Sequence, residues 1–499
     1  RSMAKRQFRA IESYCPYSKL TIMLLRRLFS TSYLQLHAVP TRGTHPHLQH
    51  TLKEGQVVPG FAQEEFRERR QALAHRLGPG HHICVLNANP TRFISQDIPY
   101  VYRQCSNFYY LTGYRAPQAT LLLHCQDGHV NETQLIVQSR SEKKFLWDGP
   151  TISSDALEQL SGIPSSHAVA NLPESVSSVL GKWKMESNGS FSLWYDIKAS
   201  EGGSSDDDIV AGLQKALSIE ELQTAKHLQG HLDQLRVCKS PAEIGALKDA
   251  LSITMDAFAS LMPTLSNGGG VGEKDIEIFL EQQMRRGGAE RFSYPPVVAG
   301  GDRGNILHYI DNNCMIDEGE MVLIDAGAEK LGYAADITRT LPIGGCYSPQ
   351  QAECYDMVAA VKEEVSKHCV EGISISQLNQ LTKKAFLHAM RQDLQWPVSE
   401  EDVARVFPTS LSHHLGLDVH DCRSVSFSEP LRAGMVITVE PGLYIPHDPS
   451  PTPAIPRQYH GIAIRLEDVM QITASEPINL CQALPITRGA IEGLCQSSV

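Results

Sequence analysis

Apolar and polar positions alternate in a way that predicts both helices and strands from about residue 55 onward. Residues 64–77 place Phe66, Leu73 and Leu77 near helical spacing, with charged side chains between them. Other stretches are apolar runs typical of strands: 81–88, 119–125 and 187–197. The mixture predicts a mixed α/β N-terminal domain over residues 55–230.

A second domain is expected over residues 231–499. Its first helix, 239–263, should begin at Ser240, because Pro241 suits the first helical position and Glu243 completes a capping box. A second helix begins in the same way at Ser348-Pro349. Strands are predicted at the following segments: "PPVVAG", "MVLIDAGA", "YAADITRTL", "MVITVEPGLYI" and "GIAIRLEDVMQI". The whole chain is therefore expected to belong to the α/β (α+β) class.

Composition excludes several classes of function. The 499 residues are 42% hydrophobic and 20% charged, as in ordinary soluble domains, and the net charge of −11 gives no electrostatic case for nucleic acid. No apolar run reaches the ~18 residues that a membrane-spanning helix needs. The 12 cysteines contain no C-x-x-C pair, which favours free thiols in a reducing compartment.

The first 54 residues differ from the rest. They are rich in basic and serine residues, and Glu12 is their only acid before Glu54. This composition is typical of a mitochondrial transit peptide, although a merely basic tail is the alternative. We expect a mitochondrial protein, with a cytoplasmic form also conceivable, and the site of leader cleavage is not defined.

Two aspartates lie in the apolar segment "MVLIDAGAEKLGYAADITRT". If residues 321–329 and 332–341 form a hairpin that turns at Lys330-Leu331, Asp325 and Asp336 directly oppose each other. Two carboxylates ~4 Å apart repel by roughly 4 kcal/mol at an effective dielectric of ~20. A shared proton, access to water or a bound cation would relieve this repulsion. Because the flanking residues are apolar, a cation is the favoured interpretation.

Further candidate ligands occur later in the chain. Glu440 ends the strand-like "MVITVE", Glu467 shares a predicted strand with Arg465, and "SHHLGLDVHD" supplies His413. With the two aspartates, four negative charges and one neutral imidazole would balance two divalent cations. A mostly oxygen ligand set suits Mn²⁺, and Co²⁺ and Zn²⁺ are also compatible. Two such ions activate water and polarise a carbonyl, which is the chemistry of amide hydrolysis.

Several motifs resemble one known family, and they are distributed over residues 55–495. They are "IPYVYRQCSNFYYLTGY", "LWDGP", "SYPPVVAGG", "LHYIDNN", "IDAGAEKLGYAADITRT", "LGLDVHD", "MVITVEPGLYI" and "GIAIRLED". The chain resembles the aminopeptidase P family of dinuclear metallopeptidases, in particular its mitochondrial branch. The resemblance implies a creatinase-type N-terminal domain followed by a pita-bread catalytic domain. It also implies hydrolysis of the N-terminal Xaa-Pro bond of peptides by a hydroxide that bridges two metals.

The resemblance also implies the metal ligands. Asp325 would bind one metal, His413 and Glu440 the other, and Asp336 and Glu467 would bridge both.

Substrate contacts are implied in the same way. Glu440 would be the general base, while His308 and His420 would contact the scissile carbonyl and the proline region. Arg465 would lie near Glu467 and the substrate, and Tyr294 near the metals. His308 and Tyr294 could instead be packed core groups.

The chain departs from the family pattern at Thr409. The family usually has a histidine four positions before the ligand histidine, so substrate affinity and full activity are in question, while metal binding is not. Prolidase, the dipeptidase of the same fold, and a catalytically weak protein-binding module remain alternatives. The resemblance further implies a homodimer.

Overall fold

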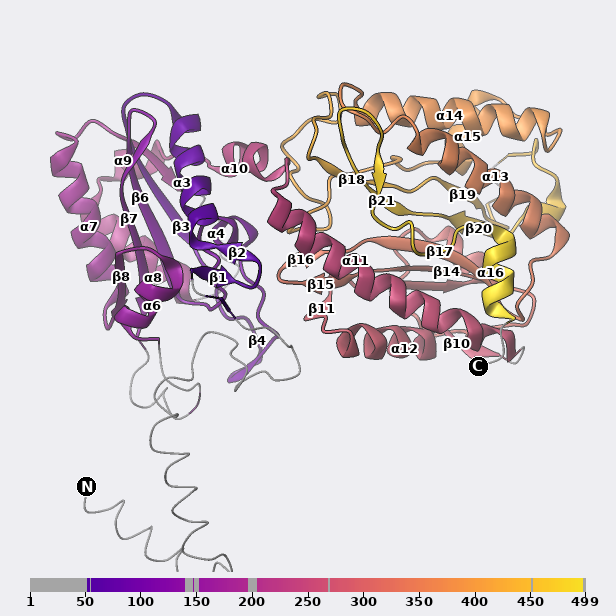
Figure 1. Cartoon of the computed structure of the whole chain (residues 1–499), viewed down its shortest axis with the longest axis horizontal. Helices are drawn as coiled ribbons and strands as arrows, with labels where there is room; N and C mark the ends of the chain where they lie inside the picture. Colours follow the sequence, from indigo (N-terminus) through magenta and orange to yellow (C-terminus); the bar gives the residue numbers. More distant parts are fainter. Residues whose placement is uncertain are drawn as a thin grey trace, which may run out of the picture.

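The computed structural model describes residues 52–53, 55–139, 147, 152–195, 204–267, 270–449 and 452–496. The chain forms two halves that lie side by side (Figure 1). Residues 1–51 of the predicted leader and most of the "LWDGP" motif lie outside the described residues. The predicted limits of the domains stay predictions. Within the described residues, no helix is both long and apolar enough to cross a membrane.

The N-terminal half is built on one mixed sheet with strand order β8-β7-β6-β3-β9. Its pairs are antiparallel except β7–β8 and β3–β9, which are parallel. The elements of this half are β1 (Gln56–Val58), β2 (Phe61–Ala62), α3 (Gln63–Leu77), β3 (His81–Asn87), β4 (Phe93–Ser95), β5 (Ile98–Pro99), α4 (Ser106–Thr112), β6 (Ala119–Gln126), β7 (His129–Gln138), α6 (Ser154–Ser161), β8 (Ser165–Val169), α7 (Leu172–Glu186), β9 (Ser192–Tyr195), α8 (Ser204–Ala216), α9 (Ile219–Gln223) and α10 (Gln229–Arg236). The helix and strands expected over 64–77, 81–88 and 119–125 are confirmed, and within the described part of 187–197 the strand is Ser192–Tyr195.

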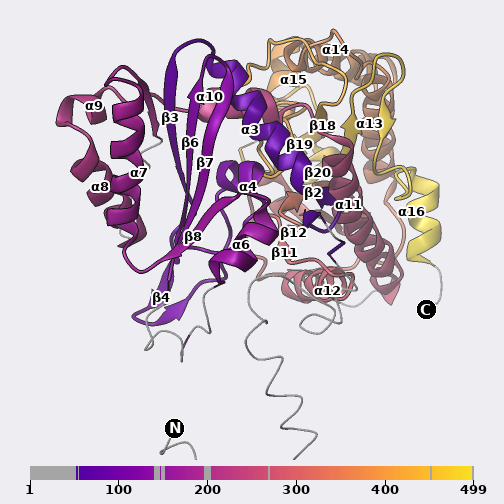
Figure 2. The same cartoon turned by 60° about the vertical axis from the view of Figure 1, so that its left-hand side comes forward.

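This sheet is buried on both faces, which explains its continuous apolar runs. Ile83 and Val85 of β3 pack in one cluster with α7 and α8. Cys84 and Leu86 pack on the opposite face, in a cluster that continues into the C-terminal half. Figure 2 shows α7 and α8 on the outer side of the sheet and α3, α4 and α10 on the inner side. The two halves therefore share one hydrophobic core.

The C-terminal half places short sheets between two groups of helices, with α11 and α12 on one side and α13 and α14 on the other (Figure 1). Its helices are α11 (Pro241–Leu261), α12 (Glu273–Arg286), α13 (Pro349–Ser366), α14 (Ile375–Gln392), α15 (Glu400–Val406) and α16 (Arg488–Cys495), with 3₁₀ turns η2 (Met262–Asn267), η3 (Gly301–Asn305) and η4 (Arg457–Tyr459). Its strands are β10 (Val271–Gly272), β11 (Arg291–Phe292), β12 (Val297–Gly300), β13 (Met315–Ile316), β14 (Met321–Ala326), β15 (Ala328–Lys330), β16 (Tyr333–Ala334), β17 (Ile337–Pro342), β18 (Val436–Val439), β19 (Gly442–Ile445), β20 (Ile462–Arg465), β21 (Asp468–Gln471) and β22 (Ile478–Asn479). The helix starts predicted at Ser240 and Ser348 are confirmed for α11 and α13, and the structure has a capping box at each.

The predicted register of the aspartate hairpin was wrong by two residues. Asp325 pairs with Thr338, and the two-residue turn is Leu331-Gly332, between Lys330 and Tyr333. Both turn residues have positive φ, 52° and 80°, as a tight hairpin turn with the twist of its strands requires. Glycine supplies such a conformation without strain, so Gly332 was the better sequence signal. Because the shift is even, Asp325 and Asp336 stay on the same face as diagonal neighbours.

Three predicted strands are interrupted at an acid. The segment 436–445 breaks into β18 and β19 at Glu440-Pro441, and the segment 462–471 breaks into β20 and β21 at Leu466-Glu467. The segment 333–342 breaks at Ala335-Asp336. Pro441 lacks an N–H for the ladder, which accounts for the first break. Each interruption places a carboxylate where the strand ladder is open.

Candidate metal centre

Three side chains that are far apart in sequence lie close together in the C-terminal half. Asp336, His413 and Glu467 each offer a ligand atom within 4.8 Å of the others. Asp336 and Glu467 are 4% and 1% exposed. One oxygen of Glu467 accepts a hydrogen bond from Thr338 at 2.7 Å, whereas Oε1 is buried and has no hydrogen-bond partner among the described residues. An unpartnered buried carboxylate oxygen is costly, and a cation would satisfy it.

Asp325 joins this group through Tyr294 and is held by Arg465. The Tyr294 hydroxyl lies 2.6 Å from Asp325 Oδ1 and 2.5 Å from Asp336 Oδ1. A hydroxyl has one proton, so it cannot donate to both carboxylates at full strength. Arg465 donates to Asp325 at 2.6 Å and to the Tyr444 hydroxyl at 2.8 Å. Arg465 was expected near Glu467. Its ion pair is with Asp325, and it is linked to Glu467 through the Thr338 hydroxyl, which hydrogen-bonds to both side chains.

His413 and Glu440 complete the group. His413 Nε2 lies 3.4 Å from Asp336 and 3.4 Å from Glu440. Its Nδ1 lies 3.1 Å from the backbone oxygen of His414, and an Nδ1–H donated there orients the ring with Nε2 directed at the acids. The neighbouring His414 thus contributes its backbone carbonyl. Thr438 donates to Glu440 at 3.2 Å.

The pKa values of these groups are shifted because several carboxylates lie close together in a buried site. Burial, with the neighbouring carboxylates Asp336 and Asp325, raises the pKa of Glu440 to about 7. Burial and the other carboxylates also raise the pKa values of Asp336 and Glu467. Burial opposes protonation of His413, but Asp336 and Glu440 outweigh it and raise its pKa to about 9. Without cations the group therefore retains protons, so the residues fit divalent metal ions well.

Two predicted substrate residues lie at the rim of this centre. His308 and His420 are both exposed. The His420 ring contacts that of His413 with centroids 4.4 Å apart, and burial together with the nearby His413 lowers the pKa of His420 to about 4. Thr409 is half-buried in the segment that follows α15.

Sequence reasoning missed the residues that support this group. Thr338 contacts Glu467 and Arg465, Thr438 contacts His413 and Glu440, and Tyr444 contacts Arg465. Threonine at alternate positions of a buried strand carries little signal, because the residue type is common in strands. Tyr444 lay within a quoted motif but was not singled out.

This mixed α/β fold holds a buried set of carboxylates around one imidazole, and three of the carboxylates lie at strand interruptions. Such a site defines a metal-dependent hydrolytic enzyme. Family models agree with this class: metallopeptidase family M24 matches residues 245–474, and the aminopeptidase P N-terminal domain matches residues 66–185. The chain belongs to the aminopeptidase P family of metallopeptidases.

Individual relatives cover nearly the whole chain. Xaa-Pro aminopeptidase 3 of Mus musculus is 34% identical over 470 residues, which is 91% of this chain and 90% of the relative. A mitochondrial intermediate cleaving peptidase 55 of Arabidopsis thaliana is 31% identical and covers 91% of this chain and 86% of its own. Zinc-substituted Escherichia coli aminopeptidase P in complex with product superimposes with a TM-score of 0.77 at 30% identity, over 88% of this chain and 99% of that one. The expected fold, an aminopeptidase P N-terminal domain followed by a pita-bread domain, is confirmed.

Proposed function

We propose that this chain is a metal-dependent aminopeptidase that hydrolyses the bond between an N-terminal residue and a following proline. The observation that carries the proposal is the convergence of the five side chains proposed as ligands: Asp325, Asp336, His413, Glu440 and Glu467. Relatives named Xaa-Pro aminopeptidase, covered over most of their length, support the same activity.

Two divalent cations would balance the four carboxylates, with His413 neutral. We propose Mn²⁺ because the set is mostly oxygen, and Co²⁺ and Zn²⁺ remain compatible. The proposed ligands are Asp325 on one ion, His413 and Glu440 on the other, and Asp336 and Glu467 between them. When bound, the ions would lower the pKa of water and polarise the scissile carbonyl.

The chain's own residues would then control protons and substrate geometry. Glu440 is the proposed general base, because its carboxylate lies in the cluster with a pKa that the surroundings raise towards neutrality. Arg465 holds Asp325 in place and is itself bonded to the Tyr444 hydroxyl. Tyr294 is proposed to lie beside the metals and the substrate.

Proline in the second position explains why direct activation of the carbonyl is useful. An Xaa-Pro bond has no N–H for a peptidase to recognise. His308 and His420 at the rim are the proposed contacts to the scissile carbonyl and the proline region. Each has an exposed imidazole that a peptide can reach.

Location and assembly are part of the proposal. The basic leader and the mitochondrial relative of Arabidopsis thaliana support mitochondrial import, with a cytoplasmic form also proposed. A homodimer is proposed from the family resemblance.

The proposal is tested with purified, Mn²⁺-loaded protein and an Xaa-Pro-Yaa tripeptide. We expect Asp336→Ala to remove turnover, because it deletes a proposed bridging ligand, and Asp97→Ala on the exposed N-terminal surface to leave it unchanged. Thr409→His should leave turnover equal or raise it. Bound metal is counted in each variant by atomic absorption.

Other outcomes identify the alternatives. Cleavage restricted to Xaa-Pro dipeptides would indicate a prolidase, and full metal content without turnover would indicate a binding module. Full activity in Asp336→Ala, or after thorough chelation, would contradict the proposal.

A further inference from the structure

The segment that carries His420 has no regular structure of its own. Residues 415–424 form bends and turns between the ligand His413 and β18. Yet the His420 ring is held against His413, with ring centroids 4.4 Å apart. An exposed histidine on an irregular segment needs support from elsewhere in the molecule to keep one position.

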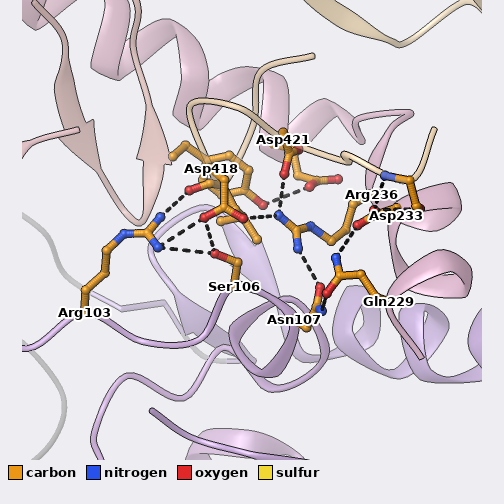
Figure 3. A network of polar contacts seen from close by, with 12 residues as sticks. Arg103, Ser106, Asn107, Gln229, Asp233, Arg236, Asp418 and Asp421 are labelled. Atoms are coloured by element: carbon orange, nitrogen blue, oxygen red, sulfur yellow. Dashed lines mark hydrogen bonds and ion pairs between the residues drawn. The ribbon is translucent and has the colours of Figure 1, made fainter. Parts of the chain in front are cut away.

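Two aspartates flank His420 and bind groups outside the segment. Asp418 accepts a hydrogen bond from Ser106 at 2.7 Å and lies 3.2 Å from Arg103 Nη1. Its other oxygen accepts from Arg236 at 2.9 Å. Arg103 also donates to the backbone carbonyl of Leu417. Asp418 is therefore held by two parts of the N-terminal half, the segment of Arg103 and Ser106 on one side and α10 on the other (Figure 3).

Asp421 is the more deeply buried of the two, with a side chain 1% exposed. It accepts from Arg236, and Lys239 lies 3.2 Å from its second oxygen. Burial raises its pKa, but Arg236 and Lys239 outweigh this and hold the pKa below its usual value. Packing is close here, because a Cβ at Gly416 would collide with Asp421.

The contacts continue as a chain through both halves. Arg236 donates to Asn107 at 2.5 Å, and Asn107 donates to Gln229 at 2.8 Å. Gln229 donates to Asp233 at 2.6 Å, and Asp233 accepts from Ser424, at the far end of the His420 segment. Figure 3 shows these side chains converging from three parts of the chain. We call the following set of side chains the seam network: Arg103, Ser106, Asn107, Gln229, Asp233, Arg236, Asp418 and Asp421.

We propose that Asp418 and Asp421, held by Arg103 and Arg236, are positioning residues that fix His420 beside His413. The N-terminal half would thereby set the position of His420 from within the same chain. The inference rests on the proposed function, in which His420 contacts the substrate. Arg103, Ser106 and Arg236 belong to the N-terminal half and Asp418 to the C-terminal half, so the segment loses this support without the N-terminal half.

Activity measurements with and without His420 test the inference. We expect Asp418→Asn and Arg103→Met each to lower kcat/KM for the tripeptide about 10-fold with metal content unchanged, as for groups that orient a functional residue. In a His420→Ala background the same substitutions should change kcat/KM less than about twofold, because the group they position is gone. Arg67→Met, at an arginine 72% exposed and paired with Glu64, is the matched control and should have no effect. Effects that add fully to His420→Ala would overturn the inference.

Hydrogen exchange tests the positioning without any assay of activity. Amides of residues 415–424 should exchange faster in Asp418→Asn and Arg103→Met than in the wild type or Arg67→Met, measured by mass spectrometry of peptides. Unchanged exchange in both variants would overturn the inference even if the enzyme is active. An inactive wild-type protein would refute the proposed function, while faster exchange would still support the positioning role.

Discussion

At the scale of single residues, the centre depends on hydroxyl groups that no motif singled out. Thr338 lies directly opposite Asp325 in the β14–β17 pair and is fully buried. It donates to Glu467 and accepts from Arg465, so one side chain orients an acid and the arginine that holds another acid. Such supporting contacts set the direction of ligand oxygens and so affect metal affinity.

Thr338→Val should weaken Mn²⁺ binding about 10-fold, because valine keeps the volume but removes the hydrogen bonds to Glu467 and Arg465. Titration calorimetry measures the affinity. Thr382→Val is the control, since Thr382 is equally buried and donates to Leu378 within α14. Both variants should lose about 1 kcal/mol in the free energy of unfolding. Equal metal affinity in the two variants would contradict the role given to Thr338.

At the scale of elements, a tight turn aligns the two aspartates. Leu331 and Gly332 both have positive φ, and the turn is fastened by Tyr109, whose hydroxyl donates to the Leu331 carbonyl at 2.8 Å. The turn fixes the register of β15 and β16, and the β14–β17 pair follows the same register. The common face of Asp325 and Asp336 therefore depends on this turn, whose residues Leu331 and Gly332 are not themselves part of the proposed metal centre.

Gly332→Ala should lower the free energy of unfolding by about 1–2 kcal/mol, because an L-residue is strained at φ 80°. The added Cβ would also lie 3.2 Å from the Tyr109 ring. Gly181→Ala, inside α7 with open space around its Cβ, should raise the same quantity by about 0.5–1 kcal/mol. Urea unfolding of both variants measures the difference, and a stabilising Gly332→Ala would be inconsistent with the turn.

At the scale of the whole molecule, stability and metal binding are linked through protons. Without metal, the folded chain holds protons on Glu440, with its pKa raised to about 7, and on His413, with its pKa raised to about 9. Both groups titrate lower when the chain is unfolded. The folded metal-free protein therefore binds more protons than the unfolded one, so its stability falls as pH rises from ~4.5 through ~9.

The Tm of the chelated protein should accordingly fall as pH rises from ~6 to ~8. The gap between its Tm and that of the Mn²⁺-loaded protein should widen by several degrees over this range. Metal ions replace those protons, so the loaded protein lacks this source of pH dependence, and metal affinity itself rises with pH. Differential scanning calorimetry of both forms across this range gives the gap in Tm at each pH. A gap that stays constant or narrows as pH rises would contradict the protonated state of the empty centre.

Much of this molecule follows from local pattern. The capping boxes at Ser240 and Ser348 marked the starts of α11 and α13, because they satisfy the free N–H groups of a first turn within four residues. Acids in apolar strands indicated the centre, since such groups are rarely buried without a partner. The sequence by itself therefore determined the main helices and strands that carry the centre, the class of the fold and the types of residue that cluster.

Only the tertiary structure decided how those residues meet. The register of Asp325 against Thr338 depends on a turn whose positive φ values are tolerated because Tyr109 and Glu290 bind it from elsewhere in the chain. The ion pair of Arg465 with Asp325 joins segments 140 residues apart, and the seam network joins both halves. Hydrogen bonds and ion pairs act over a few ångströms in space and leave no period along the chain, which is why these contacts had to be seen in the fold.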